Sequence, residues 1–285
     1  MWVAPARRLS YDRCSMSTRV AFALCALVLS SCRSSDGDPP LDRDPSVLGN
    51  GSTLHGLLDP ESKDKIDVSP PATCGQTFST PVNVTGAQVN WVDRYQETTD
   101  GTSSTGTVWV QDFGATGPWS GTSFFSPSFV PSNLTLGAGD VIDFNGLYQE
   151  SVCIGANVNF QQRGGTARLA QIATPTVTLR FDNNPATPVE IPLDDLYDFE
   201  TGRKWIGMLV TIRNVRTRYE AVSNGRVTWR LSDEQGAPGL SNEFRPFEPG
   251  EISENVEFES VTGVLTWFFD FKIASRYPED LVRAQ

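Results

Sequence analysis

The chain has 285 residues, enough for one large domain or two ordinary ones. Its 24 glycines and 19 prolines, and the absence of long helical periodicity, indicate short strands joined by turns. The net charge of -11 disfavours partners that are themselves anionic, such as nucleic acid or anionic membrane.

The N-terminal region carries an export signal. Residues 20–29 (VAFALCALVL) form an unbroken apolar run after Arg19, too short to span a bilayer and typical of a signal peptide. The run leads into Leu29-Ser30-Ser31-Cys32, which resembles the lipobox of bacterial lipoproteins, whose cysteine is acylated and becomes the new N-terminus. The resemblance implies removal of residues 1–31, lipidation of Cys32 and membrane anchoring in the cell envelope, facing the periplasm or the cell surface.

Two alternatives stay open here. An ordinary cleaved signal followed by an incidental cysteine would give the same pattern, and Met16 is a second candidate for the true start. In either case, removal of residues 1–31 takes away four bases and one acid. The remaining chain has 19 bases and 33 acids, a net charge of -14.

Residues 32–73 are expected to form a disordered tether, because Ser, Asp, Gly and Pro dominate its first part and Pro70-Pro71 closes it. His55, the only histidine of the chain, lies in this segment. The folded part is therefore expected to lack histidine, which would exclude Ser-His-Asp and Cys-His catalysis and zinc sites with imidazole ligands.

After loss of the signal and lipidation of Cys32, two cysteines remain, Cys74 and Cys153. An even pair in an oxidising compartment predicts a disulfide between them. Closing a loop of about 80 residues would stabilise the fold by about 4 kcal/mol. Two buried free thiols are the alternative.

Residues 74–180 are predicted to form a first small β-barrel. Short strands alternate with glycine-containing loops, and Gly86 marks a bend within the first strand. Gly139-Asp140 forms a turn into a strand that contains Gly146, and Asp140 is better explained as a turn residue than as an acid–base partner of Asp143. The predicted strands are residues 82–92, 107–112, 122–125, 141–148, 166–169 and 176–179.

Residues 181–203 are predicted to be a solvated acidic connector. They contain six acids, and Pro192 to Leu196 has the composition of a first helical turn, with an early proline and acids at its positive end. Clustered acids suggest calcium, but their spacing matches no EF-hand loop. No metal and no cofactor is therefore expected.

Residues 204–285 are predicted to form a second small barrel, with strands at 208–215, 227–233, 261–267 and 271–274. The two modules share weak internal similarity. Val84 matches Val210, Trp109 matches Trp229, and Gly146 matches Gly263. These matches indicate a tandem duplication.

The pattern of a glycine-aspartate turn, a strand and a glycine after a tryptophan-containing hairpin resembles the OB-fold domains of bacterial extracellular proteins. The closing segment, residues 261–281, is the most similar part, and the resemblance covers roughly residues 80–283. Such domains accompany secreted nucleases and occur in tandem in lipoproteins. The resemblance implies an all-β chain of two OB-like barrels that bind oligonucleotides or oligosaccharides, or are structural. It carries over no nuclease domain and no catalytic residue.

One segment argues for binding. Residues 203–230 contain seven bases and one acid, and basic side chains with aromatic neighbours can track phosphates and stack on bases. Alternatively, this surface packs against the acidic connector or the first module, and Trp229 belongs to the core. The candidate ligand-binding residues are Arg213, Arg216, Arg218, Tyr219, Trp229 and Arg230.

The remaining motifs carry little chemistry. Neither G-x-S-x-G nor a phosphate-binding G-x-x-x-x-G-K-[ST] occurs. Trp119, in a glycine-rich loop, would hold a sugar ring or cover a barrel end. We therefore expect a non-enzymatic binding or structural lipoprotein whose partner is an envelope protein or a glycan. The alternatives are nucleic-acid or oligosaccharide binding by the second barrel, and a hydrolase whose site the sequence does not reveal.

Overall fold

The structure is a computed structural model that describes residues 48–67, 77–93, 107–124, 136–152, 168–182, 184–223, 226–234, 236–268 and 270–285. These residues belong to one compact unit, Leu41–Gln285. The predicted signal peptide, Cys32, Cys74 and Cys153 lie outside the described residues. The expected all-β class is confirmed, and within the described ranges no helix is both long and apolar enough to cross a membrane.

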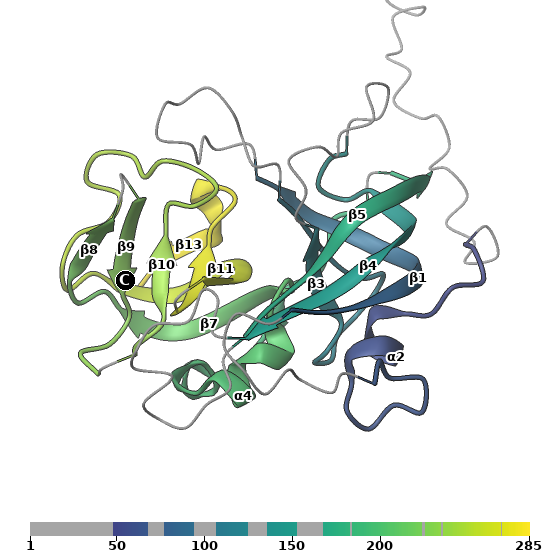
Figure 1. The fold of residues 1–285 in the computed structure, drawn as a ribbon. Coiled ribbons are helices and arrows are strands. Elements are labelled where there is room, and N and C mark those ends of the chain that lie inside the picture. The colour runs from purple at the N-terminus through teal and green to yellow at the C-terminus, as the bar shows by residue number, and fades with distance from the viewer. Residues whose placement is uncertain are drawn as a thin grey trace, which may run out of the picture. The chain divides into compact units, whose positions relative to one another are not determined.

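The first sheet pairs its strands in a closed ring, β1-β2-β3-β5-β4 (Figure 1). Strand β3 runs parallel to β5, and the other pairings are antiparallel. Strand β1 pairs with both β2 and β4 because it bends at Gly86, whose φ of +68° is readily adopted only by glycine. The strands are β1 (Thr77–Val92), β2 (Val108–Asp112), β3 (Gly121–Phe124), β4 (Val141–Val152) and β5 (Arg168–Phe181).

The second sheet has the order β6-β7-β11-β12-β10-β9-β8, with β13 paired to β11. Strand β10 runs parallel to β12, as β3 does to β5. The strands are β6 (Val189–Glu190), β7 (Leu209–Arg216), β8 (Glu220–Ser223), β9 (Arg226–Arg230), β10 (Gly239–Ser241), β11 (Glu257–Phe268), β12 (Asp270–Ala274) and β13 (Leu281–Arg283). The short helices are α2 (Leu54–Leu58), η2 (Leu193–Tyr197), α4 (Phe199–Gly202), η3 (Arg203–Trp205) and η4 (Pro278–Asp280).

The two sheets repeat one pairing order. The path β7-β11-β12-β10-β9 corresponds to β1-β4-β5-β3-β2, and β8 pairs with β9 as β1 does with β2. Two glycines hold equivalent places in this order. A Cβ on Gly146 would lie 2.6 Å from Ile172 Cγ2, and a Cβ on Gly263 would lie 2.6 Å from the Ala274 carbonyl oxygen. Both glycines therefore permit a close approach of the neighbouring strand.

The match of Gly146 with Gly263 thus has a structural basis, whereas the other matches are out of register. Gly146 pairs with Val82 and Gly263 with Val210, so the residue of the first module that is equivalent to Val210 is Val82 and not Val84. The tryptophan match is displaced by one residue. Trp229 faces Leu240 on β10, and the equivalent pair in the first sheet is Val108 with Phe124.

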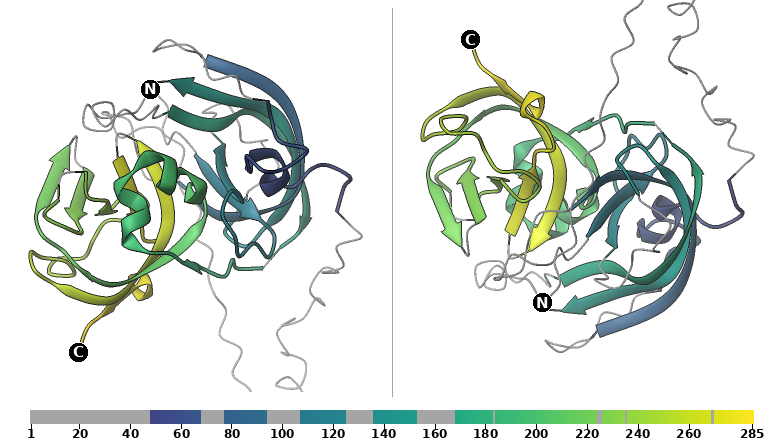
Figure 2. Two further views of the ribbon diagram at one scale, coloured as in Figure 1. Left: turned by 90° about the horizontal axis from the view of Figure 1, so that it is seen from below. Right: turned by 90° about the horizontal axis from the view of Figure 1, so that it is seen from above.

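The prediction of a disordered tether over residues 32–73 is wrong for residues 48–67. Helix α2 lies over one end of the first ring of strands (Figures 1 and 2), and Leu54 is buried in the core of that sheet. Thr53 caps the helix through its side chain, and Ser52 forms a parallel bridge with Val84. A low apolar content overall concealed the helical spacing of Leu54, Leu57 and Leu58.

The acidic connector, residues 181–203, is not a solvated spacer. The helical turn predicted at its Pro192 to Leu196 segment is confirmed as η2. However, the apolar side chains of this region, Ile191, Leu196 and Phe199, are buried in the core of the second sheet. The second module therefore begins near β6, before residue 204.

A buried junction joins the two sheets. Asn90 Nδ2 on β1 donates to the Gly207 carbonyl oxygen (2.8 Å) and to Gln111 Oε1 (2.9 Å), which also accepts from the Leu209 backbone N–H (2.9 Å). Gly207 has a φ of +85°, and a Cβ there would lie 2.4 Å from the Thr122 backbone nitrogen. The chain just before β7 is therefore held directly against β3.

Replacing Leu54 tests whether the N-terminal segment is part of the fold. Leu54→Ala should lower the free energy of unfolding by about 2–5 kcal/mol, because it leaves a cavity in the first core. Lys63→Ala, at an exposed position of the same segment, should be close to neutral. Urea unfolding measures both. Equal stabilities of the two variants would show that α2 does not belong to the core.

Candidate ligand-binding cavity

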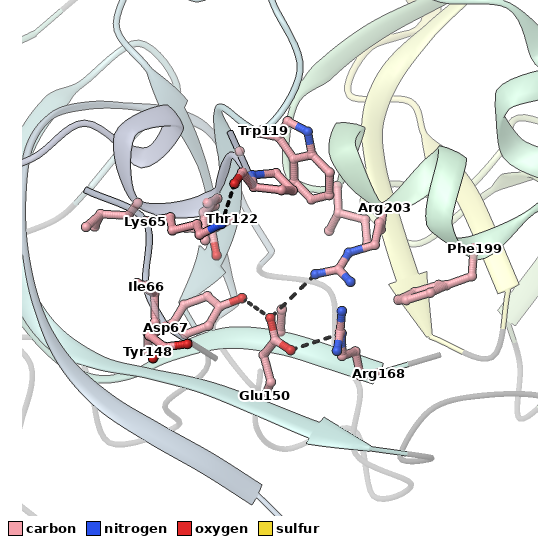
Figure 3. Close-up of a pocket in the computed structure, with 16 residues that line it drawn as sticks. Lys65, Ile66, Asp67, Trp119, Thr122, Tyr148, Glu150, Arg168, Phe199 and Arg203 are labelled. Atoms are coloured by element: carbon pink, nitrogen blue, oxygen red, sulfur yellow. Dashed lines mark hydrogen bonds and ion pairs between the residues drawn. The ribbon is translucent and has the colours of Figure 1, made fainter. Parts of the chain in front are cut away.

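A cavity of about 280 Å³ opens where three parts of the chain meet. The N-terminal segment supplies Leu57 and Ile66. The first sheet supplies Glu150 and Arg168, and the region before β7 supplies Arg203 (Figure 3). The walls are partly apolar, and a small number of charged side chains converge on one end. This composition is typical of small-molecule sites.

A buried carboxylate is the centre of the charged group. Glu150 is 2% exposed and accepts a hydrogen bond from Tyr148 Oη, with 2.5 Å between Oη and Oε1. Arg168 Nε lies 3.0 Å from Glu150 Oε2, and Arg203 Nη2 lies 3.5 Å from Oε1 (Figure 3). Tyr148 and Glu150 are two residues apart on β4, so their side chains share a face of the strand.

Tyr148 acts as a permanent donor in this group. Burial raises the pKa of its hydroxyl well above the ordinary value, and the adjacent Glu150 carboxylate raises it further. The two arginines oppose this shift without reversing it. The hydroxyl therefore keeps its proton at neutral pH and holds the carboxylate in place.

Trp119 lines the cavity in a strained backbone conformation. Its φ is +64°, which is uncommon for a bulky residue, and its backbone N–H donates to the Lys204 carbonyl oxygen at 2.6 Å. The guanidinium of Arg203 lies 5.3 Å from the centre of the Trp119 ring and 5.7 Å from that of Phe199. Strain of this kind persists where the surrounding structure imposes it, and it is frequent at functional sites.

The arginines predicted from the sequence to bind a ligand are engaged in ion pairs and do not line the cavity. Arg213 pairs with Glu190 and Arg216 with Glu257. Arg218 pairs with Asp233 at 3.2 Å, and Arg230 pairs with Asp270. Since acids of the same chain balance all four charges, the nucleic-acid hypothesis for the second module loses its motivation.

The two aromatic candidates, Trp229 and Tyr219, differ in their exposure to solvent. Trp229 is partly buried and packs against the core of the second sheet, whereas Tyr219 is 48% exposed. Lys204 pairs with Asp195 of the connector at 2.9 Å, and Arg203 reaches Glu150 of the first module. The basic segment therefore forms ion pairs with the acidic connector and with the first module. This packing was the alternative interpretation of the sequence.

Sequence reasoning missed Glu150 and Arg168. The available signal was the spacing of Tyr148 and Glu150, which places a carboxylate on the inward face of β4. Arg203 was noticed only as part of a basic segment, because its contact with Glu150 joins residues that lie 53 positions apart. Trp119 was noted as a sugar platform or a barrel cover, and the structure places it in the cavity wall.

The exclusion of histidine from the folded part is wrong, since His55 lies on α2. Its Nδ1 is 3.0 Å from the Pro118 carbonyl oxygen, and its Nε2 is 3.4 Å from Asp59 Oδ2. Behind it, the buried Asp112 carboxylate accepts the backbone N–H groups of Leu54 (2.6 Å) and His55 (2.8 Å). Asp112 thus attaches the start of α2 to the first sheet.

Metal binding and known relatives give no further guidance. Within the part of the chain that the structure describes, no group of three or more His, Cys, Asp or Glu side chains could hold a metal ion. No protein-family model, curated protein or solved structure matches the chain. The candidate site is therefore assigned from its geometry alone.

Asp112 should make stability depend on pH. Burial raises its pKa from 3.8 to about 6, although the hydrogen bonds from His55 and Leu54 and the charge of His55 oppose this. The folded protein therefore holds this proton more tightly than the unfolded chain does. As pH falls from about 6 to about 4, this group should raise the free energy of unfolding by up to about 3 kcal/mol.

Asp112→Asn should remove this part of the pH dependence, and urea unfolding between pH 4 and pH 7 measures it. Glu61→Gln, at an exposed position, is the matched control and should keep the wild-type profile. Parallel profiles for wild type and Asp112→Asn would contradict the assignment.

Proposed function

We propose that the protein is a membrane-anchored lipoprotein of the bacterial cell envelope whose folded part is a non-enzymatic binding module. The observation that carries the binding role is the cavity between Trp119 and the Glu150 group. Its volume of about 280 Å³ suits a small ligand, because it lies just below the range of about 300–1,000 Å³ that is typical of small-molecule sites.

We also propose that the two modules are OB-like barrels. The shared pairing order and the parallel pairings β3–β5 and β10–β12 support this, as does the equivalence of Gly146 and Gly263. OB-type barrels are small, five-stranded and partly open, and they bind oligonucleotides or oligosaccharides. The paired arginines of the second module favour the saccharide side of this alternative.

The cavity is better suited to holding a ligand than to reacting with one. The Glu150 carboxylate already interacts with one hydroxyl and two guanidinium groups. The Tyr148 hydroxyl keeps its proton because burial raises its pKa. The carboxylate is thus held by its partners and the hydroxyl keeps its proton, which supports a binding role without catalysis.

Filling the cavity tests the binding role. Ala170 is a partly buried residue of the cavity wall on β5, so Ala170→Phe should occupy the space with little effect on the core. In a thermal-shift panel of small metabolites, a ligand should raise the melting temperature of the wild type and not of this variant. The control, Arg216→Ala, changes an exposed residue outside the cavity wall and should respond like the wild type. An equal response of Ala170→Phe would exclude the cavity as the site.

The lipid anchor at Cys32 and the Cys74–Cys153 disulfide stay proposals. Thr77, three residues after Cys74, and Ser151, two residues before Cys153, are register partners, and their hydroxyl oxygens lie 2.8 Å apart. This pairing supports a disulfide because it brings the segment that follows Cys74 next to the segment that precedes Cys153.

One measurement addresses both modifications. Intact-mass spectrometry of the protein made in a bacterial host should show acyl chains on a chain that begins at Cys32, and none after Cys32→Ser. Reduction should add two hydrogens to the wild type and none to Cys74→Ser. A mature chain that begins elsewhere, or a mass unchanged by reduction, would refute the respective proposal.

A further inference from the structure

We infer that the cavity ligand is a neutral sugar ring, held with its C–H face against the apolar wall and with its neighbouring hydroxyls bridging Glu150 and Arg168. This inference rests on the proposed binding function and names the ligand class. Three independent features of the cavity carry it: charge balance, incomplete hydrogen bonding and a preformed aromatic wall.

The charges around the cavity cancel. Arg203 also pairs with Glu200, with 3.3 Å between Nη1 and Oε2, so each guanidinium has a carboxylate close by. Counting Glu200 with the charged residues of the wall gives three cations and three anions: Lys65, Arg168 and Arg203 against Asp67, Glu150 and Glu200. A charged ligand would find no net countercharge and would lose its hydration, so a neutral ligand is favoured.

Two buried atoms of the cavity lack a complete hydrogen bond. Glu150 Oε2 and Arg168 Nε lie 3.0 Å apart as an ion pair, but among the described residues neither makes a well-aligned hydrogen bond. One atom is an acceptor and the other a donor. A hydroxyl group can donate to the first and accept from the second, so a polyhydroxylated ring satisfies both. A new hydrogen bond contributes most binding free energy where it satisfies a buried polar atom that lacks a partner.

Trp119 supplies a wall that is set before binding. Its backbone is held at φ +64° by the hydrogen bond to Lys204, and Arg203 lies against its ring. Leu57 and Ile66 add apolar surface from the N-terminal segment. A rigid apolar wall beside paired charges matches a sugar ring, which has C–H groups on its faces and hydroxyls around its edge.

Titration calorimetry of the full mature chain tests the ligand class with glucose, galactose, N-acetylglucosamine and glucuronate. At least one neutral sugar should bind about tenfold or more tightly than glucuronate. Glu150→Gln should reverse this preference by about tenfold or more, since it leaves the arginines with excess positive charge. Arg168→Lys keeps the charge and loses the Nε donor, so it should weaken neutral sugars without changing the preference.

Two substitutions of the tryptophan complete the design. Trp119→Gly removes the ring at a φ suited to glycine and should weaken binding about tenfold, whereas Trp119→Phe should retain most of the affinity. Arg216→Ala, outside the cavity wall, should bind like the wild type. Thermal unfolding of each variant checks that it is folded.

Four results would overturn the inference. The arginines alone would favour glucuronate, and tighter binding of glucuronate than of every neutral sugar would show an anion site. An unchanged preference in folded Glu150→Gln would remove the role of this carboxylate. A non-sugar ligand lost in Ala170→Phe would retain the binding function but refute the ligand class, whereas no ligand in the whole panel would refute both.

Discussion

The close approach of Gly207 to β3 is the constraint on which the two-module arrangement depends. A side chain at this position would collide with the Thr122 backbone, and the Gly207 carbonyl oxygen accepts from the buried Asn90 side chain. Leu209, two residues later, donates to Gln111 of the same sheet. Because the chain before β7 is held here, Arg203 and Trp205 follow a fixed path, and Arg203 reaches Glu150.

The cavity is a product of this junction and of the N-terminal segment. Neither sheet alone supplies a complete wall, since Leu57 and Ile66 come from residues before β1 and Arg203 from residues before β7. Asp112 secures α2 through two backbone N–H groups, and Asp143 secures Gly49 in a similar way. The segment expected to be a tether thus closes one side of the cavity, and the cavity follows from the way the parts are joined.

Local chemistry was predictable where one or two neighbouring residues decide the structure. Gly86 bends β1 with a positive φ, and Asp140 closes a turn by accepting the Gly137 backbone N–H at 2.7 Å. Gly146 and Gly263 were matched correctly because glycine is required where the next strand approaches closely. The register of the accompanying valines was wrong by two residues, since strand periodicity is compatible with any even shift.

The sequence by itself determined the all-β class, the bends and turns, and the acidic surplus, because these depend on composition and on neighbouring residues. Only the tertiary structure decided which acidic side chain pairs with each basic side chain. It paired Arg213 with Glu190 and brought Arg168 and Arg203 to one buried carboxylate. Ion pairs and cavities depend on which distant segments meet, and that follows from strand order and from packing at Gly207, not from local spacing.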